Sequence, residues 1–157
     1  MRSTASVVFA GPASPKWTLS PLRRGYGDPC YDVAADGSIW RTSLMRSGPV
    51  TARISRGGRD TVDCEAWGPG AAEFTETLPA QLGADDDVTG FAPENPTVAA
   101  AFRKSPHLRL GRTGRVVEAL IPAILEQRVI GKDAFGAWRK LVTKYGAPAP
   151  GLSLIHI

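Results

Sequence analysis

Apolar and polar residues alternate through the first half of the chain, and this pattern predicts an antiparallel sheet. In residues 61–67 every second side chain is apolar, which is the period of a half-buried strand. Asp36-Gly37 can take the positive φ of a tight hairpin turn. Further strands are expected at residues 18–22, 30–33, 38–43 and 50–55. Residues 71–82 carry a helical stripe of apolar side chains and would cover one face of the sheet.

The second half of the chain has the spacing of helices. Asn95 can cap free N–H groups and Pro96 fits a first turn, so a helix is expected from there to about residue 104. Residues 114–128 read as a core helix, kinked by Pro122, because their apolar side chains fall in pairs at helical spacing. Residues 132–145 predict a third helix after a brief connection, and the two would form a hairpin. The apolar face of this third helix would consist of Phe135, Trp138, Leu141, Val142 and Tyr145.

Charge is unevenly distributed along this pattern. Residues 1–102 contain nine Lys or Arg against twelve Asp or Glu, a net charge of −3. Residues 103–144 contain ten Lys or Arg against three acids, a net charge of +7. A positive region favours a polyanionic partner, with nucleic acid first among the candidates. The alternative is a solvated helix surface, and charge alone does not separate the two.

Metal, redox and membrane chemistry find little support in the sequence. Cys30 and Cys64 lack the CxxC spacing of a zinc or redox motif, and we expect two thiols rather than a disulfide. The adjacent carboxylates of residues 85–87 read as a solvated turn rather than a metal site, because neighbours in a loop point in different directions. No apolar run has the length of a membrane span, and no secretory signal is recognisable. A cytoplasmic location is the expectation.

Common catalytic motifs are absent from the sequence: there is no nucleophile elbow, P-loop, dinucleotide fingerprint or HExxH. Residues 111–115 form a glycine-rich, basic stretch that leads into a helix start. Free N–H groups at such a start could hold a phosphate, and a plain loop is the other interpretation.

The most informative pattern is VEALIPAILEQRVIGKDAFGAWRKLVTKYG, at residues 117–146. It resembles the opening helical hairpin of helix-hairpin-helix DNA glycosylases of the 3-methyladenine type. The residues that match are Ala123, Ile124, Leu125, Gln127, Val129, Tyr145 and Gly146. Residues 19–22 and 27–30, followed by a hairpin, also resemble actinobacterial members of this family.

This resemblance implies both a fold and a site. The fold is α+β: an N-terminal antiparallel β-sheet with covering helices, similar to a TATA-binding-protein repeat, then the first helices of an all-α glycosylase domain. In the family the residue after the glutamine lies at the tip between two helices and fills the gap left by an extruded base. That residue is Arg128, beside Gln127, and the nearby Lys132 and Arg139 would hold phosphates. The plug is often apolar, so an arginine departs from the pattern, although its plane can stack on bases.

The resemblance also implies an activity. The family hydrolyses the N-glycosidic bond of alkylated purines without a metal or an organic cofactor. Its partner is double-stranded DNA with damaged bases, which a monomer would bind in the bacterial cytoplasm at the nucleoid. The family's catalytic aspartate follows a helix-hairpin-helix motif C-terminal to the hairpin, and no acid of this chain matches it. We therefore assign no catalytic residue and expect an inactive fragment.

The ends of the chain differ from its middle. We expect a flexible N-terminus at residues 1–16, a sheet-and-helix domain at 17–92 and the start of a helical domain at 93–151. Residues 152–157, LSLIHI, translate codons that resemble a transposase end sequence used in DNA sequencing. We interpret them as an artefactual tail, which would mean that the native protein continues and that His156 is not a candidate ligand.

Two other interpretations stay open. A non-enzymatic DNA-binding regulator would use residues 114–145 as a helix-turn-helix. A recognition helix exposes polar side chains near its start, whereas Phe135 and Trp138 read as buried. A small α+β interaction module with a solvated basic face is the third interpretation, in which Gln127 and Arg128 are ordinary residues at the end of a helix.

Overall fold

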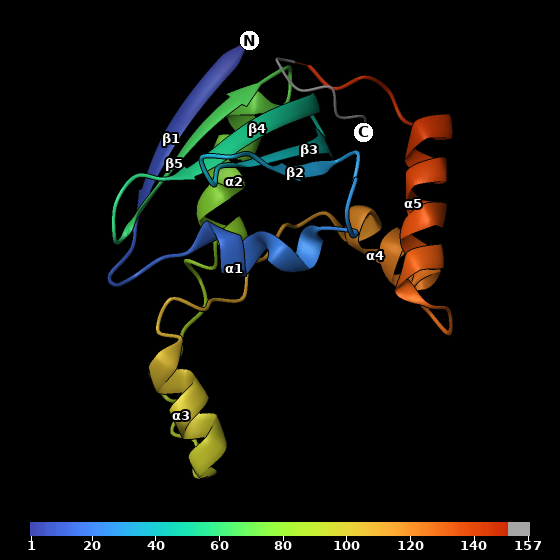
Figure 1. Cartoon of the computed structure of the whole chain (residues 1–157). Helices are drawn as coiled ribbons and strands as arrows, with labels where there is room; N and C mark the ends of the chain where they lie inside the picture. Colours follow the sequence, from blue (N-terminus) through green and yellow to red (C-terminus); the bar gives the residue numbers. More distant parts are fainter. Residues whose placement is uncertain (151–157) are drawn as a thin grey trace.

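The computed structural model describes residues 1–150, in which a five-stranded antiparallel sheet carries helices on one side (Figure 1). The strand order is β1-β5-β4-β3-β2. The strands are β1 (Arg2–Val8), β2 (Tyr31–Val33), β3 (Ile39–Met45), β4 (Gly48–Arg56) and β5 (Thr61–Trp67). The strands predicted around residues 30–33, 38–43, 50–55 and 61–67 are confirmed. Of the predicted pair Asp36-Gly37, Gly37 takes a positive φ, of 81°, and Asp36 does not; Gly37 N donates to Ala34 O at 2.9 Å and closes the turn between β2 and β3.

The first 22 residues differ from the prediction in two places. The expected flexible N-terminus is wrong for residues 2–8, because β1 pairs antiparallel with the edge of β5 and turns Val7 toward the core. The expected strand at residues 18–22 is also wrong: helix α1 (Pro15–Leu19) and the 3₁₀ turn η1 (Ser20–Leu22) occupy this segment. Pro15 favours the first turn of α1, and the helix lets Leu19 become fully buried.

One face of the sheet packs against helix α2 (Ala71–Gln81), which lies behind the strands in Figure 1. The alternation predicted for β5 is confirmed, since Val62, Cys64 and Ala66 are buried against this helix layer. Phe74 and Leu78 of α2 are fully buried, and Pro79 lies inside the helix without ending it. The class is therefore α+β, as expected.

The opposite face of the sheet carries a pair of tryptophans. Trp40 on β3 and Trp67 on β5 stack with ring centroids 5.6 Å apart and an interplanar angle of 7°. Strand β4 runs between these two strands, so the indoles meet across it. Thr51 of β4, the register partner of Trp67, is fully buried.

Helix α3 (Pro96–Lys104) projects from the rest of the fold (Figure 1). It confirms the predicted start, because Asn95 Oδ1 accepts from Thr97 N at 2.9 Å. None of its residues is buried. The ring of Phe102 packs edge to face on the ring of Phe91, in the loop that precedes the helix, with the ring centroids 5.2 Å apart. Helix α3 thus contacts its own neighbouring loop.

The predicted hairpin is formed by α4 (Val116–Leu125) and α5 (Gly131–Tyr145). The expectation that the first is a core helix is wrong within residues 1–150. Pro122 is its one buried residue, while Val116 and Val117 are 75% and 67% exposed, because no described element covers that face.

Helix α5 buries part of the predicted face, through Ala134, Trp138 and Val142. Tyr145, the last residue of the helix, was expected on this face and is 74% exposed. No helix within residues 1–150 is long and apolar enough to cross a membrane. The division of the chain at residue 92 stays a prediction.

Candidate nucleic-acid interface

The connection between α4 and α5 presents the predicted tip. Helix α4 ends at Leu125, and Gln127 N still donates to Ile124 O at 3.2 Å before the chain turns into α5 at Gly131. Arg128 has a φ of 55° and is the single non-glycine residue with a positive φ among residues 1–150. A left-handed arginine costs about 1 kcal/mol, and such residues persist where the surrounding structure imposes them. The turn thus holds Arg128 in a defined, strained position.

The side chains of this tip are available to a partner. Gln127, Arg128 and Lys132 are all exposed. Within the described part of the chain, none of these three side chains makes a hydrogen bond or an ion pair. Lys132 lies in the first turn of α5, directly after the connection. The structure therefore brings three of the four predicted residues together at one end of the hairpin.

Arg139 is placed differently from the other three. It is half-buried, and its Nη1 donates to the backbone carbonyl of Tyr26 at 3.2 Å. It follows Lys132 by seven residues, so both lie on one side of α5 about 10 Å apart along the axis. Arg139 therefore joins α5 to the loop that precedes β2. It also adds positive charge on the side of α5 that carries Lys132.

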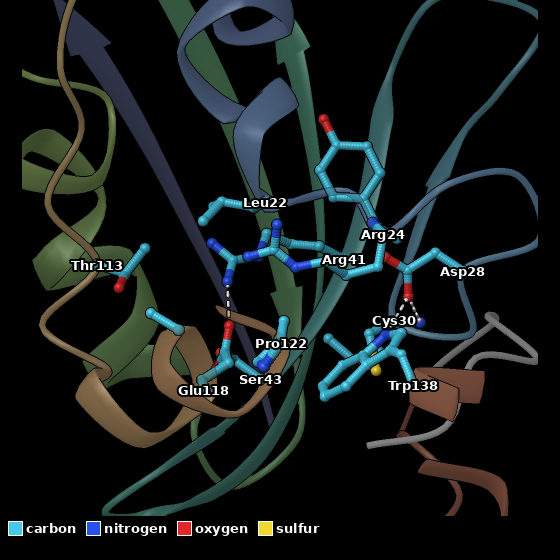
Figure 2. Close-up of a pocket in the computed structure, with 13 residues that line it drawn as sticks. Leu22, Arg24, Asp28, Cys30, Arg41, Ser43, Thr113, Glu118, Pro122 and Trp138 are labelled. Carbon is cyan, nitrogen blue, oxygen red and sulfur yellow. Dashed lines mark hydrogen bonds and ion pairs between the residues drawn. The ribbon is translucent and has the colours of Figure 1, made fainter. Parts of the chain in front are cut away.

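The loop before β2 anchors α5 through a buried carboxylate. Asp28 is 6% exposed, and its Oδ1 accepts from Trp138 Nε1 at 3.0 Å (Figure 2). Backbone N–H groups of Cys30 and Arg24 donate to the same carboxylate at 3.0 and 2.7 Å. A buried carboxylate needs such donors to offset its desolvation. Asp28 thus fixes the loop and the middle of α5 together.

The same loop also reaches the base of the tip. Arg24 Nη1 lies 3.5 Å from Glu126 Oε1, next to Gln127. Gly25 has a φ of 76°, and a Cβ atom there would overlap the ring of Phe135 on α5. That ring also lies beside Gly131, the first residue of α5. Contacts at two successive loop residues, Arg24 and Gly25, therefore hold the connection between α4 and α5 from one side.

A second polar contact joins α4 to the sheet. The guanidinium of Arg41 on β3, whose side chain is 3% exposed, donates to Glu118 of α4 (Figure 2). Arg41 also donates to Gln81 Oε1 at 3.0 Å, and the hydroxyl of Ser43 donates to Glu118. The buried arginine is thus paired and hydrogen-bonded, as burial of a charge requires. It fixes the first turn of α4 over the sheet.

A cavity of about 80 Å³ lies between these two contacts. Asp28, Cys30, Arg41, Glu118 and Trp138 are among its lining residues (Figure 2). Burial raises the pKa of the Cys30 thiol to about 12, which leaves it protonated at neutral pH and a poor nucleophile. Both carboxylates already accept several hydrogen bonds. The described lining offers structural contacts rather than a reactive group.

The other candidates from the sequence are used structurally. Of residues 85–87, Asp85 pairs with Arg112, Asp86 accepts from Leu110 N at 2.8 Å and Asp87 accepts from Thr89. No group of three potential metal ligands occurs within residues 1–150. In the glycine-rich stretch, Arg112 N donates to Ala80 O at 2.8 Å, so this amide is not free for a phosphate. The cysteines are two thiols rather than a disulfide.

Sequence reasoning did not find Asp28, Arg24, Arg41 or Glu118. Each has a partner at least 40 residues away, and Asp28 and Arg24 also make local contacts. Gly25-Tyr26-Gly27 was the one local signal, since glycines on both sides of a residue indicate a constrained turn. Both glycines have positive φ, 76° and 73°.

Comparison with known proteins adds the fold context. Neither a protein-family model nor a curated protein sequence matches the chain. The structure is similar to the 3-methyladenine DNA glycosylase of Archaeoglobus fulgidus, with a TM-score of 0.73 and 13% sequence identity over 97% of this chain and 55% of that protein. It is also similar to MBOgg1 in complex with a low affinity DNA ligand, with a TM-score of 0.69 and 15% identity over 98% of this chain and 50% of that one.

At these identities the likeness concerns the fold. It agrees with the expectation that this chain is built like a DNA glycosylase, and it extends over the sheet and the hairpin alike. The chain spans about half the length of each of these two proteins.

Proposed function

We propose that this chain is the duplex-binding part of a base-excision DNA glycosylase that removes alkylated purines such as 3-methyladenine. The observation that carries the proposal is Arg128, an exposed arginine held at a φ of 55° on the tip of a helical hairpin. The fold of the chain is similar to that of two DNA glycosylases, one of them in complex with a DNA ligand. A strained, unpartnered cation at a rigid tip suits insertion into a groove.

The tip would act by replacing a base. A base stacked in a duplex cannot be attacked, so an enzyme of this class swings it out and fills the gap. The planar guanidinium of Arg128 can stack between the neighbouring bases, while Gln127 offers an amide to the base edges. Lys132 and Arg139 would neutralise phosphates on either side.

Base release needs a further carboxylate. As the N-glycosidic bond breaks, the base takes the bonding electrons and positive charge develops on the sugar, which a nearby carboxylate stabilises until water adds. Asp28 and Glu118 are occupied by N–H and O–H donors, Asp28 between its loop and α5 and Glu118 between α4 and β3. We therefore propose that this chain binds DNA as a monomer, in the bacterial cytoplasm, without releasing bases and without a cofactor.

Binding to two matched duplexes tests the proposal. One duplex is intact, and the other carries a stable abasic analogue at its centre, which leaves a gap for the plug. Fluorescence anisotropy of the 157-residue chain should show tighter binding to the gapped duplex, and Arg128→Ala should abolish that preference. Equal binding to both duplexes by the unaltered chain would contradict the proposed function.

The same experiment separates the regulator hypothesis. A helix-turn-helix reads base edges, so its affinity should depend on sequence and not on a missing base. Trp138 of α5 is bound to Asp28 and faces the sheet unit, which favours the glycosylase interpretation. Preference for one duplex sequence, with indifference to the abasic analogue, would favour the regulator instead.

A further inference from the structure

Tyr26 is the most exposed aromatic side chain of residues 1–150, at 92%. It lies between two glycines with positive φ, in the loop that precedes β2. Large aromatic groups exposed on a constrained loop often mark interaction sites, because little conformational entropy is lost when they bind. Within the described chain, the Tyr26 side chain makes no hydrogen bond.

The loop that carries Tyr26 is held firmly although its tip is exposed. The buried Asp28 carboxylate accepts from Arg24 N and Cys30 N and thereby closes the loop. The Tyr26 carbonyl accepts from Arg139 Nη1 at 3.2 Å. Bonds on both sides of the residue thus fix its backbone, so the side chain is presented rather than left loose.

This loop also lies beside the tip of the hairpin. Arg24 pairs with Glu126, directly before Gln127, and Gly25 abuts Phe135, whose ring touches the Gly131 position. Tyr26 itself is held against the third turn of α5, through the bond from Arg139, which lies about 10 Å along the helix from Lys132. Arg139 provides positive charge at this point.

We infer that the Tyr26 side chain is a second contact to duplex DNA, which meets the strand beside the gap that Arg128 fills. The inference rests on the proposed function of the Arg128 tip. It extends the DNA-binding surface to the loop that precedes β2. A phenol can donate to a phosphate oxygen, and its ring can pack on sugar or base. Positive charge from Arg139 beside it, and from Lys132 about 10 Å along α5, suits a phosphate backbone.

The test is the affinity of the 157-residue chain for the abasic duplex. Tyr26→Ala should weaken binding about fivefold, the loss of one exposed contact. The slope of affinity against salt should stay unchanged, because no charge is removed, whereas Lys132→Ala should lower it by about one. Tyr145→Ala is the matched control: this exposed tyrosine lies at the far end of α5, and binding should stay unchanged.

The outcomes separate the inference from the function on which it rests. If Arg128→Ala abolishes the gap preference while Tyr26→Ala binds like the unaltered chain, the Tyr26 contact is refuted and the proposed function stands. If the unaltered chain does not bind duplex DNA, both are refuted. If Tyr26→Ala weakens binding, Tyr26→Phe shows which part of the side chain makes the contact. Weakening equal to that of Tyr26→Ala attributes the contact to the hydroxyl, and binding equal to that of the unaltered chain attributes it to the ring.

Discussion

Trp138 Nε1 donates to Asp28 Oδ1 at 3.0 Å, which joins two residues that are 110 positions apart in the chain. One residue comes from a loop of the sheet unit and the other from the middle of α5. The bond is buried, so its loss leaves a donor or an acceptor unsatisfied in the interior. The orientation of the hairpin thus depends on a contact that neither segment forms alone.

Asp28→Asn should lower the free energy of unfolding by about 2 kcal/mol. An amide NH₂ would replace one of two acceptor oxygens and face a backbone donor. Urea unfolding measures the loss. Trp17→Phe is the control, because this tryptophan is 56% exposed and its indole makes no hydrogen bond in the described chain. Equal stability of Asp28→Asn and the unaltered chain would rule out the anchoring role.

Gly25→Ala should destabilise the fold more than Gly27→Ala. Both residues have positive φ, so each alanine carries a conformational cost of about 1 kcal/mol. At Gly25 the new methyl group also overlaps the Phe135 ring, whereas nothing lies within 4 Å at Gly27. The difference between the two variants in urea unfolding isolates that contact. It should shrink when Phe135 is replaced by alanine, and a difference of zero would contradict the packing described.

Glu118→Ala should cost about 2 kcal/mol of stability, because it leaves the buried Arg41 with Gln81 as its remaining side-chain partner. Partial exposure of Glu118, at 31%, keeps the loss below that of a fully buried pair. Glu126→Ala is the matched control, since its pair with Arg24 is longer and more exposed and should contribute less than 1 kcal/mol. If both variants unfold at the same urea concentration, Arg41 does not depend on Glu118.

Arg128→Gly should separate stability from binding. Glycine adopts positive φ without strain, so the free energy of unfolding should stay the same or rise by up to about 1 kcal/mol. Preference for the abasic duplex should disappear with the guanidinium. Lys132→Gly is the comparison, because it lies in the first turn of α5 and should lose up to about 1 kcal/mol. A marked loss of stability in Arg128→Gly would show that the side chain supports the fold.

Alkaline pH should destabilise the protein through its buried thiols. Burial raises the pKa of Cys30 and of Cys64 from 9.0 to about 12, so the unfolded chain loses these protons first. Stability from this source is complete below pH 9 and falls between pH 9 and 12, by up to about 1.4 kcal/mol per pH unit for each thiol. Urea midpoints measured across this range should fall less steeply for the Cys30→Ser, Cys64→Ser double variant. An identical slope would contradict the burial of the thiols.

Local pattern was enough to predict most of the fold. Alternation in residues 61–67, the Asp36-Gly37 turn and the Asn95 cap each appear as expected, because they depend on neighbours in sequence. Strand β1 was missed since its pairing partner lies about 60 residues away, and nothing in its own residues requires an edge strand. Helix α4 reads as core from its apolar residues, but what covers a helix is decided by tertiary contacts.

The exposed residues of the candidate site could be predicted from the sequence. Gln127, Arg128 and Lys132 follow from the pattern of the hairpin, and the structure places them together at its end. What positions them could not be predicted, since Asp28 and Arg24 reach α5 and the tip across more than 100 residues. The role of these residues in binding stays a prediction.

The stacked indoles of Trp40 and Trp67 give this protein an internal optical reporter. Two indoles stacked at 5.6 Å have coupled electronic transitions, so their absorption differs from that of separated indoles. Because the rings come from β3 and β5 and meet across β4, the signal exists while these three strands keep their register. Loss of this signal reports on the sheet alone, whereas helical circular dichroism also includes the hairpin that Trp138 anchors, so comparing the two makes the order in which the parts come apart observable.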